Sequence, residues 1–263
     1  MDMPALTLEQ RKIKKLRRFN IIMACLHFGQ GVIMLYASSS FSLPVTTAYV
    51  EMNSVTQLLT PVLKTIADLQ IGPLVAGFFF LSAFAHFAVS CLPTVRAWYE
   101  ANLKKGANYA RWIEYAFSSS LMIVIVVMLT GMADLSSLIL IFFLNMMMIL
   151  FGWIMELHNQ TTKTTDWTSF IFGSIAGFIP WLIVALYLFN AGGEGARAPS
   201  FVYWIFFSIF LCFNVFAISM ILQYKKIGKW KDYLYGERTY IILSLVAKSL
   251  LAWQVFAGTL RPV

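Results

Sequence analysis

Long uninterrupted apolar stretches dominate the pattern of hydrophobic and polar positions along the chain. Seven such stretches are each close to the ~20 residues that a helix needs to cross a bilayer. No internal repeat or low-complexity segment accompanies them. The pattern predicts an all-α membrane protein, a bundle of seven transmembrane helices, with spans near 19–38, 73–95, 108–132, 135–157, 167–190, 201–224 and 239–260.

The connections between these spans differ in length. The short "MADLSS" at 132–137 makes the third and fourth spans a tight antiparallel pair, and we expect the third helix to begin near residue 105. The one long connection, 39–72, contains "FSLPVTTAYVEM", which is rich in β-branched residues and alternates loosely. This pattern predicts a short β-hairpin outside the membrane.

The expected organisation is a basic N-terminal segment (1–18), a membrane domain (19–260) and a short C-terminal tail (261–263). The basic segment resembles the start of a signal peptide. The apolar run that follows it is longer than a signal peptide needs and contains His27 and Gln30, so we expect it to be retained as a helix.

Composition supports the membrane assignment, because 59% of the residues are hydrophobic and only 12% are charged. A soluble domain would carry about 25% charged residues. Three scattered cysteines (Cys25, Cys91 and Cys212) form neither a disulfide framework nor a zinc pattern. The net charge of +8 indicates basic loops that face anionic lipid, and we expect no nucleic-acid partner.

The distribution of Lys and Arg predicts the orientation in a cell membrane. The N-terminal segment and the 2–3, 4–5 and 6–7 connections together hold 16 of these residues, and the opposite side holds three, Lys64, Arg197 and Arg261. Positively charged loops stay in the cytoplasm. The N-terminus is therefore predicted to be cytoplasmic and the C-terminus extracellular.

One lysine, Lys248 in "SLVAKSLLAWQ", lies in the middle of the seventh span. A lysine at that depth costs roughly 2.5–3.5 kcal/mol on insertion scales. From a rise of ~1.5 Å per helical residue, Lys248, Glu114, His27 and His86 all lie roughly 14–15 Å from the cytoplasmic edge. The sequence predicts that these four groups are the buried ionisable set.

Structural roles compete with functional ones for each of these groups. Lys248 could snorkel, the histidines could be ordinary interhelical hydrogen-bond partners, and Glu114 could pair with Arg111. A buried lysine and a buried carboxylate at one depth offset each other's desolvation cost. A desolvated lysine is also a nucleophilic amine that can form a Schiff base with an aldehyde, for which Glu114 would be the counterion.

Four stretches of the chain resemble heliorhodopsins, and the similarity extends over essentially the whole chain. They are "RWIEYAFSSSLMI" (111–123), "ILFGW" (149–153), "QYKKIGKWKDYLYGER" (223–238) and "GERTYIILSLVAKSLLAWQVFAGTL" (236–260). These stretches look like that family's third, fourth and seventh helices and its 6–7 loop. The inverted orientation predicted from charge also agrees with that family.

The resemblance implies a photoreceptor, not an enzyme, with all-trans retinal on Lys248 and Glu114 as counterion. Ser82, Ser118 and Ser244 would hydrogen-bond around the Schiff base, and His27 and His86 would border a polar cavity that influences the path of the proton. It further implies a homodimer with the 39–72 hairpin at the interface. The residues implied to line the chromophore are Tyr115, Met122, Met148, Gly152, Trp181, Phe213 and Trp253.

Ser244 departs from ordinary microbial rhodopsins, which have an aspartate four residues before the lysine. With Glu114 as the one deep carboxylate, we predict light-driven deprotonation and signalling through a cytoplasmic partner, without efficient pumping. A proton transporter that uses Glu114, His27 and His86 is the alternative. A membrane enzyme with a lysine nucleophile is a third hypothesis, for which no second catalytic constellation is evident.

Overall fold

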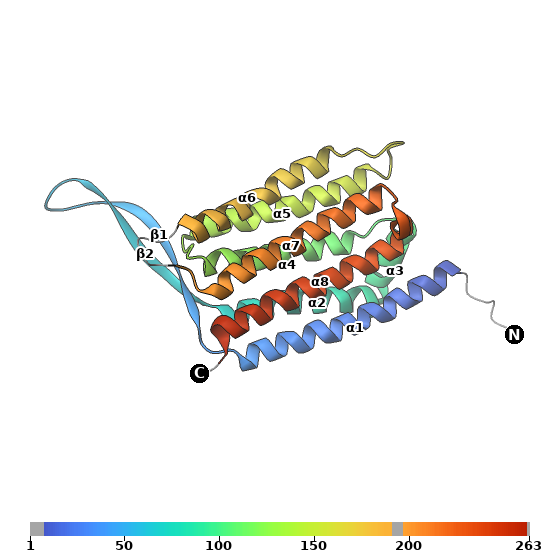
Figure 1. The fold of residues 1–263 in the computed structure, drawn as a ribbon, viewed down its shortest axis with the longest axis horizontal. Helices are drawn as coiled ribbons and strands as arrows, with labels where there is room; N and C mark the ends of the chain where they lie inside the picture. Colours follow the sequence, from blue (N-terminus) through green and yellow to red (C-terminus); the bar gives the residue numbers. More distant parts are fainter. Residues whose placement is uncertain (1–7, 191–196, 262–263) are drawn as a thin grey trace.

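The structure is a bundle of long helices with a two-stranded sheet at one end. The computed structural model describes residues 8–190 and 197–261. Within these residues seven helices are long and apolar enough to cross a membrane, which confirms the predicted number. They lie side by side along one axis (Figure 1). The seven are α1 (Leu8–Ala37), α2 (Ile71–Cys91), α4 (Tyr109–Leu129), α5 (Leu135–His158), α6 (Thr168–Asn190), α7 (Ser200–Tyr224) and α8 (Tyr233–Val255).

The two ends of the bundle differ in character (Figure 1). We call one the basic end, where α1 begins and where the short helices α3 (Pro93–Lys104) and η1 (Gly228–Lys231) lie. The other, the hairpin end, holds the sheet and the end of α8, which continues as η2 (Phe256–Leu260). Residues 8–18 of the expected N-terminal segment belong to α1, whereas residues 1–7 and residues 262–263 of the expected tail lie outside the described residues.

The expected β-hairpin is present between α1 and α2. Strand β1 (Ser42–Met52) pairs antiparallel with β2 (Leu59–Gln70). The side-chain oxygen of Asn53 accepts two backbone N–H groups in the connecting turn, as asparagine commonly does. At its base the sheet is joined to the turn between α4 and α5, because Thr46 N donates to Ala133 O at 2.8 Å. The tip extends away from the bundle (Figure 1).

Helix α3 was not predicted, and two predicted helix bounds beside it are wrong. The second span ends at Cys91, not near 95, because Pro93 restricts the preceding Leu92 to an extended conformation. Pro93 then starts α3, where its missing N–H has no cost. The third helix begins at Tyr109, close to the predicted span start of 108 but not near 105 as expected, and the Asn108 side chain caps it by accepting from the backbone N–H of Arg111.

The interior of the bundle toward the hairpin end is apolar. Its buried core includes Phe78, Phe79, Ile125, Leu251 and Val255. Among the described residues, the buried charged side chains lie elsewhere: at the level of Lys248 or between it and the basic end. The fold therefore separates an apolar half from a half with polar and charged groups in its interior.

Candidate functional site

Lys248 and Glu114 meet inside the bundle. Lys248 Nζ of α8 lies 3.1 Å from Glu114 Oε1 of α4, and the two side chains are only 4% and 9% exposed. Two buried charges are tolerated when each is the partner of the other and hydrogen bonds complete the site. The two groups that the sequence placed at one depth are thus in direct contact.

Serine hydroxyl groups complete the coordination of this pair. Ser82 of α2 donates to Glu114 Oε1 at 2.6 Å, and Ser244, one turn before Lys248, accepts from Nζ at 2.7 Å. The third predicted serine, Ser118, is fully buried and lies close enough to interact with the Glu114 carboxylate. Ser82 and Ser244 thereby fix the orientation of the ion pair, and Ser118 adds a third hydroxyl group beside it.

The two predicted histidines stack on each other next to the pair. The ring centroids of His27 and His86 are 5.5 Å apart, and the ring planes differ by 11°. His86 Nδ1 lies 2.8 Å from Asn20 Oδ1, whereas neither ring nitrogen of His27 has a partner among the described residues. His86 and Glu114 line a common polar cavity, to which His27 does not contribute.

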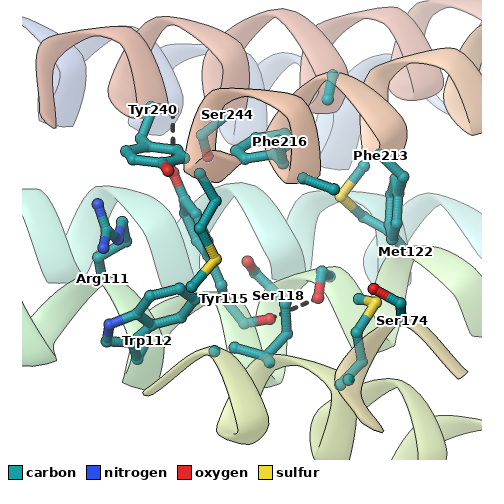
Figure 2. Close-up of a pocket in the computed structure, with 18 of the residues that line it drawn as sticks. Arg111, Trp112, Tyr115, Ser118, Met122, Ser174, Phe213, Phe216, Tyr240 and Ser244 are labelled. Atoms are coloured by element: carbon teal, nitrogen blue, oxygen red, sulfur yellow. Dashed lines mark hydrogen bonds between the residues drawn. The ribbon is translucent and has the colours of Figure 1, made fainter. Parts of the chain in front are cut away.

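A larger and mostly apolar cavity has Lys248 in its wall. Side chains from α4, α5, α6, α7 and α8 form this wall, and Figure 2 shows the aromatic rings of Trp112, Phe213 and Phe216 around the cavity. Five residues expected around a chromophore belong to this wall, and so do aromatic residues that the sequence did not single out. The wall includes Tyr115, Met122, Met148, Gly152 and Phe213, together with Trp112, Phe170, Phe216 and Tyr240.

The two predicted tryptophans lie outside this wall. Trp181 is buried and packs edge-on against Phe213 at a centroid distance of 5.3 Å, so it supports the wall from behind. Trp253 is 43% exposed, and its Nε1 donates to Gln30 Oε1 of α1 at 3.2 Å. The structure therefore does not bring Trp253 to the cavity.

A second charged cluster lies nearer the basic end, and the sequence analysis did not predict it. Arg111 of α4 forms ion pairs with Glu156 of α5 and Glu237 of α8. The side chains of all three are at most 5% exposed. The guanidinium group of Arg111 also lies over the rings of Trp112 and Tyr240, at 4.5 and 4.2 Å from their centroids. The expected buried set of one lysine, one carboxylate and two histidines was therefore too small.

One sequence signal could have indicated this cluster. Glu237, Tyr240, Ser244 and Lys248 are spaced by three or four residues, so they share one face of a helix. The structure buries this whole face of α8. Glu237 was overlooked because it lies beside Arg238 near the end of the apolar run, where a carboxylate is usually solvated.

Comparison with known proteins agrees with this geometry. A family model for heliorhodopsins matches residues 16–260. The chain belongs to the heliorhodopsin family. Together with the seven spanning helices, this makes it a multi-pass membrane protein of the rhodopsin photoreceptor type, and heliorhodopsin membership implies a retinal chromophore. No curated protein matches the chain in sequence.

The residues of the larger cavity suit the retinal of a heliorhodopsin. Retinal is an apolar polyene that ends in an aldehyde, so its site needs an amine at one end of an apolar channel. Lys248 would supply the amine, and the hydroxyl group of Ser118 lies in the same wall. Gly152 and Gly173 leave that wall without side chains, and an added Cβ at Gly152 would come within 2.5 Å of the Trp112 ring. The lining and the amine therefore fit the group.

Proposed function

We propose that this chain is a light sensor that holds all-trans retinal on Lys248 as a protonated Schiff base, with Glu114 as the counterion. The observation that carries the proposal is the buried contact between Lys248 Nζ and Glu114 Oε1, with Lys248 also in the wall of an apolar cavity. A lysine in that position is a functional candidate, because a merely structural lysine would be costly there.

The bound chromophore supplies absorption of visible light and a change of shape on isomerisation. Glu114 stabilises the positive charge on Nζ, and Ser82 holds the carboxylate by donating to the same oxygen that faces Lys248. Ser244 accepts a hydrogen bond from Nζ and so helps to hold the nitrogen in place beside Glu114. The aromatic wall excludes water from the larger cavity, which strengthens these interactions.

We propose that light drives a cycle of deprotonation and signalling without efficient ion pumping. A pump must bind the proton on one side and release it on the other. The interior between Lys248 and the hairpin end is apolar, and no charged side chain among the described residues is buried there. This observation supports a cycle in which the proton leaves the Lys248–Glu114 pair and returns to it through the half of the bundle near the basic end.

We further propose that the basic end faces the cytoplasm and that the hairpin is extracellular. The 16-to-3 distribution of Lys and Arg supports this orientation. The exposed lysines of the connection between α7 and α8 would then face a cytoplasmic signalling partner. We also propose a homodimer with the hairpin at its interface, which the exposed side chains of Leu59, Leu63 and Ile66 on β2 support.

The assignment of Lys248 is tested by expression with all-trans retinal. The wild-type chain should form a coloured protein, and Lys248→Ala should stay colourless because no amine remains to form the linkage. A coloured Lys248→Ala variant would exclude this attachment site. Glu114→Gln should move the absorption maximum strongly, and an unchanged spectrum would exclude Glu114 as counterion.

The transporter alternative is tested in illuminated vesicles that contain the coloured protein. A sensor should give no sustained pH change on illumination. Sustained pH changes that an uncoupler abolishes would instead favour transport through Glu114 and the His27/His86 region. The same vesicles with Lys248→Ala serve as the control for effects of light alone.

A further inference from the structure

The buried charges of the described residues do not balance. Two cations, Lys248 and Arg111, face three carboxylates, Glu114, Glu156 and Glu237. Lys248 and Glu114 neutralise each other, so the excess negative charge belongs to the cluster around Arg111. An uncompensated charge in a buried site is unfavourable, and binding of one proton removes it.

Glu156 is already saturated with hydrogen-bond donors. Its Oε1 accepts from Arg111 Nη2 at 3.1 Å and from the Tyr233 hydroxyl group at 2.9 Å. Its Oε2 accepts from the Asn108 backbone N–H at 3.0 Å and from Trp112 Nε1 at 2.6 Å. Four donors fill the acceptor sites of a carboxylate. Glu156 is therefore fully hydrogen-bonded without an added proton.

Glu237 has fewer partners and borders the polar cavity. It accepts one hydrogen bond from Arg111 Nη1 and one from Asn108 Nδ2, and the Tyr233 hydroxyl group, which donates to Glu156, also lies within its reach. The same cavity is lined by Glu114 and His86, so it connects the two charged clusters. Its volume is about 40 Å³, and a buried water needs roughly 10–15 Å³ and polar neighbours. Ordered water in this cavity would carry a proton between Glu114 and Glu237.

The histidines are less suitable places for that proton. A proton on His27 would place a new buried cation in a stack with His86, and neither nitrogen of His27 has an acceptor among the described residues. The titratable and charged side chains that face Glu237 or its cavity are Arg111, Glu114, Glu156, His86, Tyr99, Tyr115, Tyr233 and Tyr240. Among these groups, the Arg111 cluster alone has more carboxylates than cations, because Glu156 and Glu237 share one guanidinium group.

We propose that Glu237 is the group that holds the proton while Lys248 is deprotonated. This inference rests on the proposed function, because light must first release the proton. The N–H bond at Lys248 Nζ breaks and leaves its electron pair on nitrogen, and an O–H bond forms on a Glu237 oxygen. The Arg111 cluster passes from one excess negative charge to neutral, while Glu114 becomes the unpaired anion. The reverse transfer restores the resting state.

Infrared difference spectroscopy on the retinal-reconstituted protein tests this proposal. The light-minus-dark spectrum of the wild-type chain should gain the carbonyl band of a protonated carboxyl group as the deprotonated state forms. Glu237→Gln should lack this band, and Glu237→Asp should keep a carboxyl band at a shifted position. Without retinal, mild acidification in the dark should produce a carboxyl band that Glu237→Gln also lacks. Glu51→Gln, an exposed change on the hairpin, should alter neither spectrum.

The outcomes separate this inference from the proposed function. A protein that stays colourless with retinal, or that never deprotonates, contradicts the proposed function itself. A coloured protein whose carboxyl band persists unchanged in Glu237→Gln and in Glu237→Asp places the proton elsewhere and overturns the inference. A wild-type protein that deprotonates without any carboxyl band also overturns it, because the proton would then reside on a histidine or leave the protein.

Discussion

Replacing Arg111 by methionine tests the energetic role of the buried cluster. The substitution keeps much of the side-chain volume but removes the only cation that faces Glu156 and Glu237 within the cluster. Removing one partner of a buried ion pair costs about 3–5 kcal/mol, because the remaining charge is stranded. A change of 1 kcal/mol shifts the Tm by about 2–4 °C in a chain of roughly this length, so we expect a decrease of roughly 6–20 °C.

The matched control is an exposed ion pair on the same protein. Lys12 Nζ lies 2.6 Å from Asp232 Oδ2, but the two side chains are 45% and 40% exposed. An exposed pair contributes at most about 1 kcal/mol, so Lys12→Met should lower the Tm by no more than about 4 °C. Thermal unfolding of both variants in one detergent, at one heating rate, measures the contrast. Equal small decreases would show that burial does not amplify the Arg111 cluster and would refute the reasoning.

Three further predictions concern other parts of the fold. Asp134 caps α5 by accepting from the Ser137 N–H and hydroxyl groups, and these hydrogen bonds lower the pKa of Asp134 below its ordinary value of about 3.8. Asp134→Ala should therefore reduce the Tm at neutral pH. The difference in Tm from the wild type should disappear as the pH falls through the lowered pKa. Trp253→Phe should leave the absorption maximum of the retinal-bound protein unchanged, because Trp253 contacts Gln30 and not the cavity, and a large spectral shift would contradict that placement. Gly152→Ala should destabilise the protein by about 1–3 kcal/mol in a thermal unfolding assay, because its Cβ would overlap the Trp112 ring, and an unchanged Tm would mean that the ring can move freely.

The apolar pattern alone determined the architecture of this protein. Seven stretches of spanning length specify seven helices, because backbone polar groups in a bilayer must be satisfied within each helix. The cost of a charge in the membrane marked Lys248, and Glu114 was selected as its partner from a depth that assumed a helix start near 105, whereas α4 begins at Tyr109. Both inferences need only the amino-acid sequence and the rise per helical residue, so they do not depend on how the helices pack.

Helix packing decided which other charged groups are buried. Glu156 and Glu237 lie near helix ends, where a sequence gives no reason to expect burial. In the fold the N-terminal part of α1 and the unpredicted α3 cover this region through Leu16, Tyr99 and Leu103. Packing also turned Trp253 toward α1, although it lies only five residues beyond Lys248. Depth follows from position along one helix, but burial and direction depend on the neighbouring helices, which only the tertiary structure supplies.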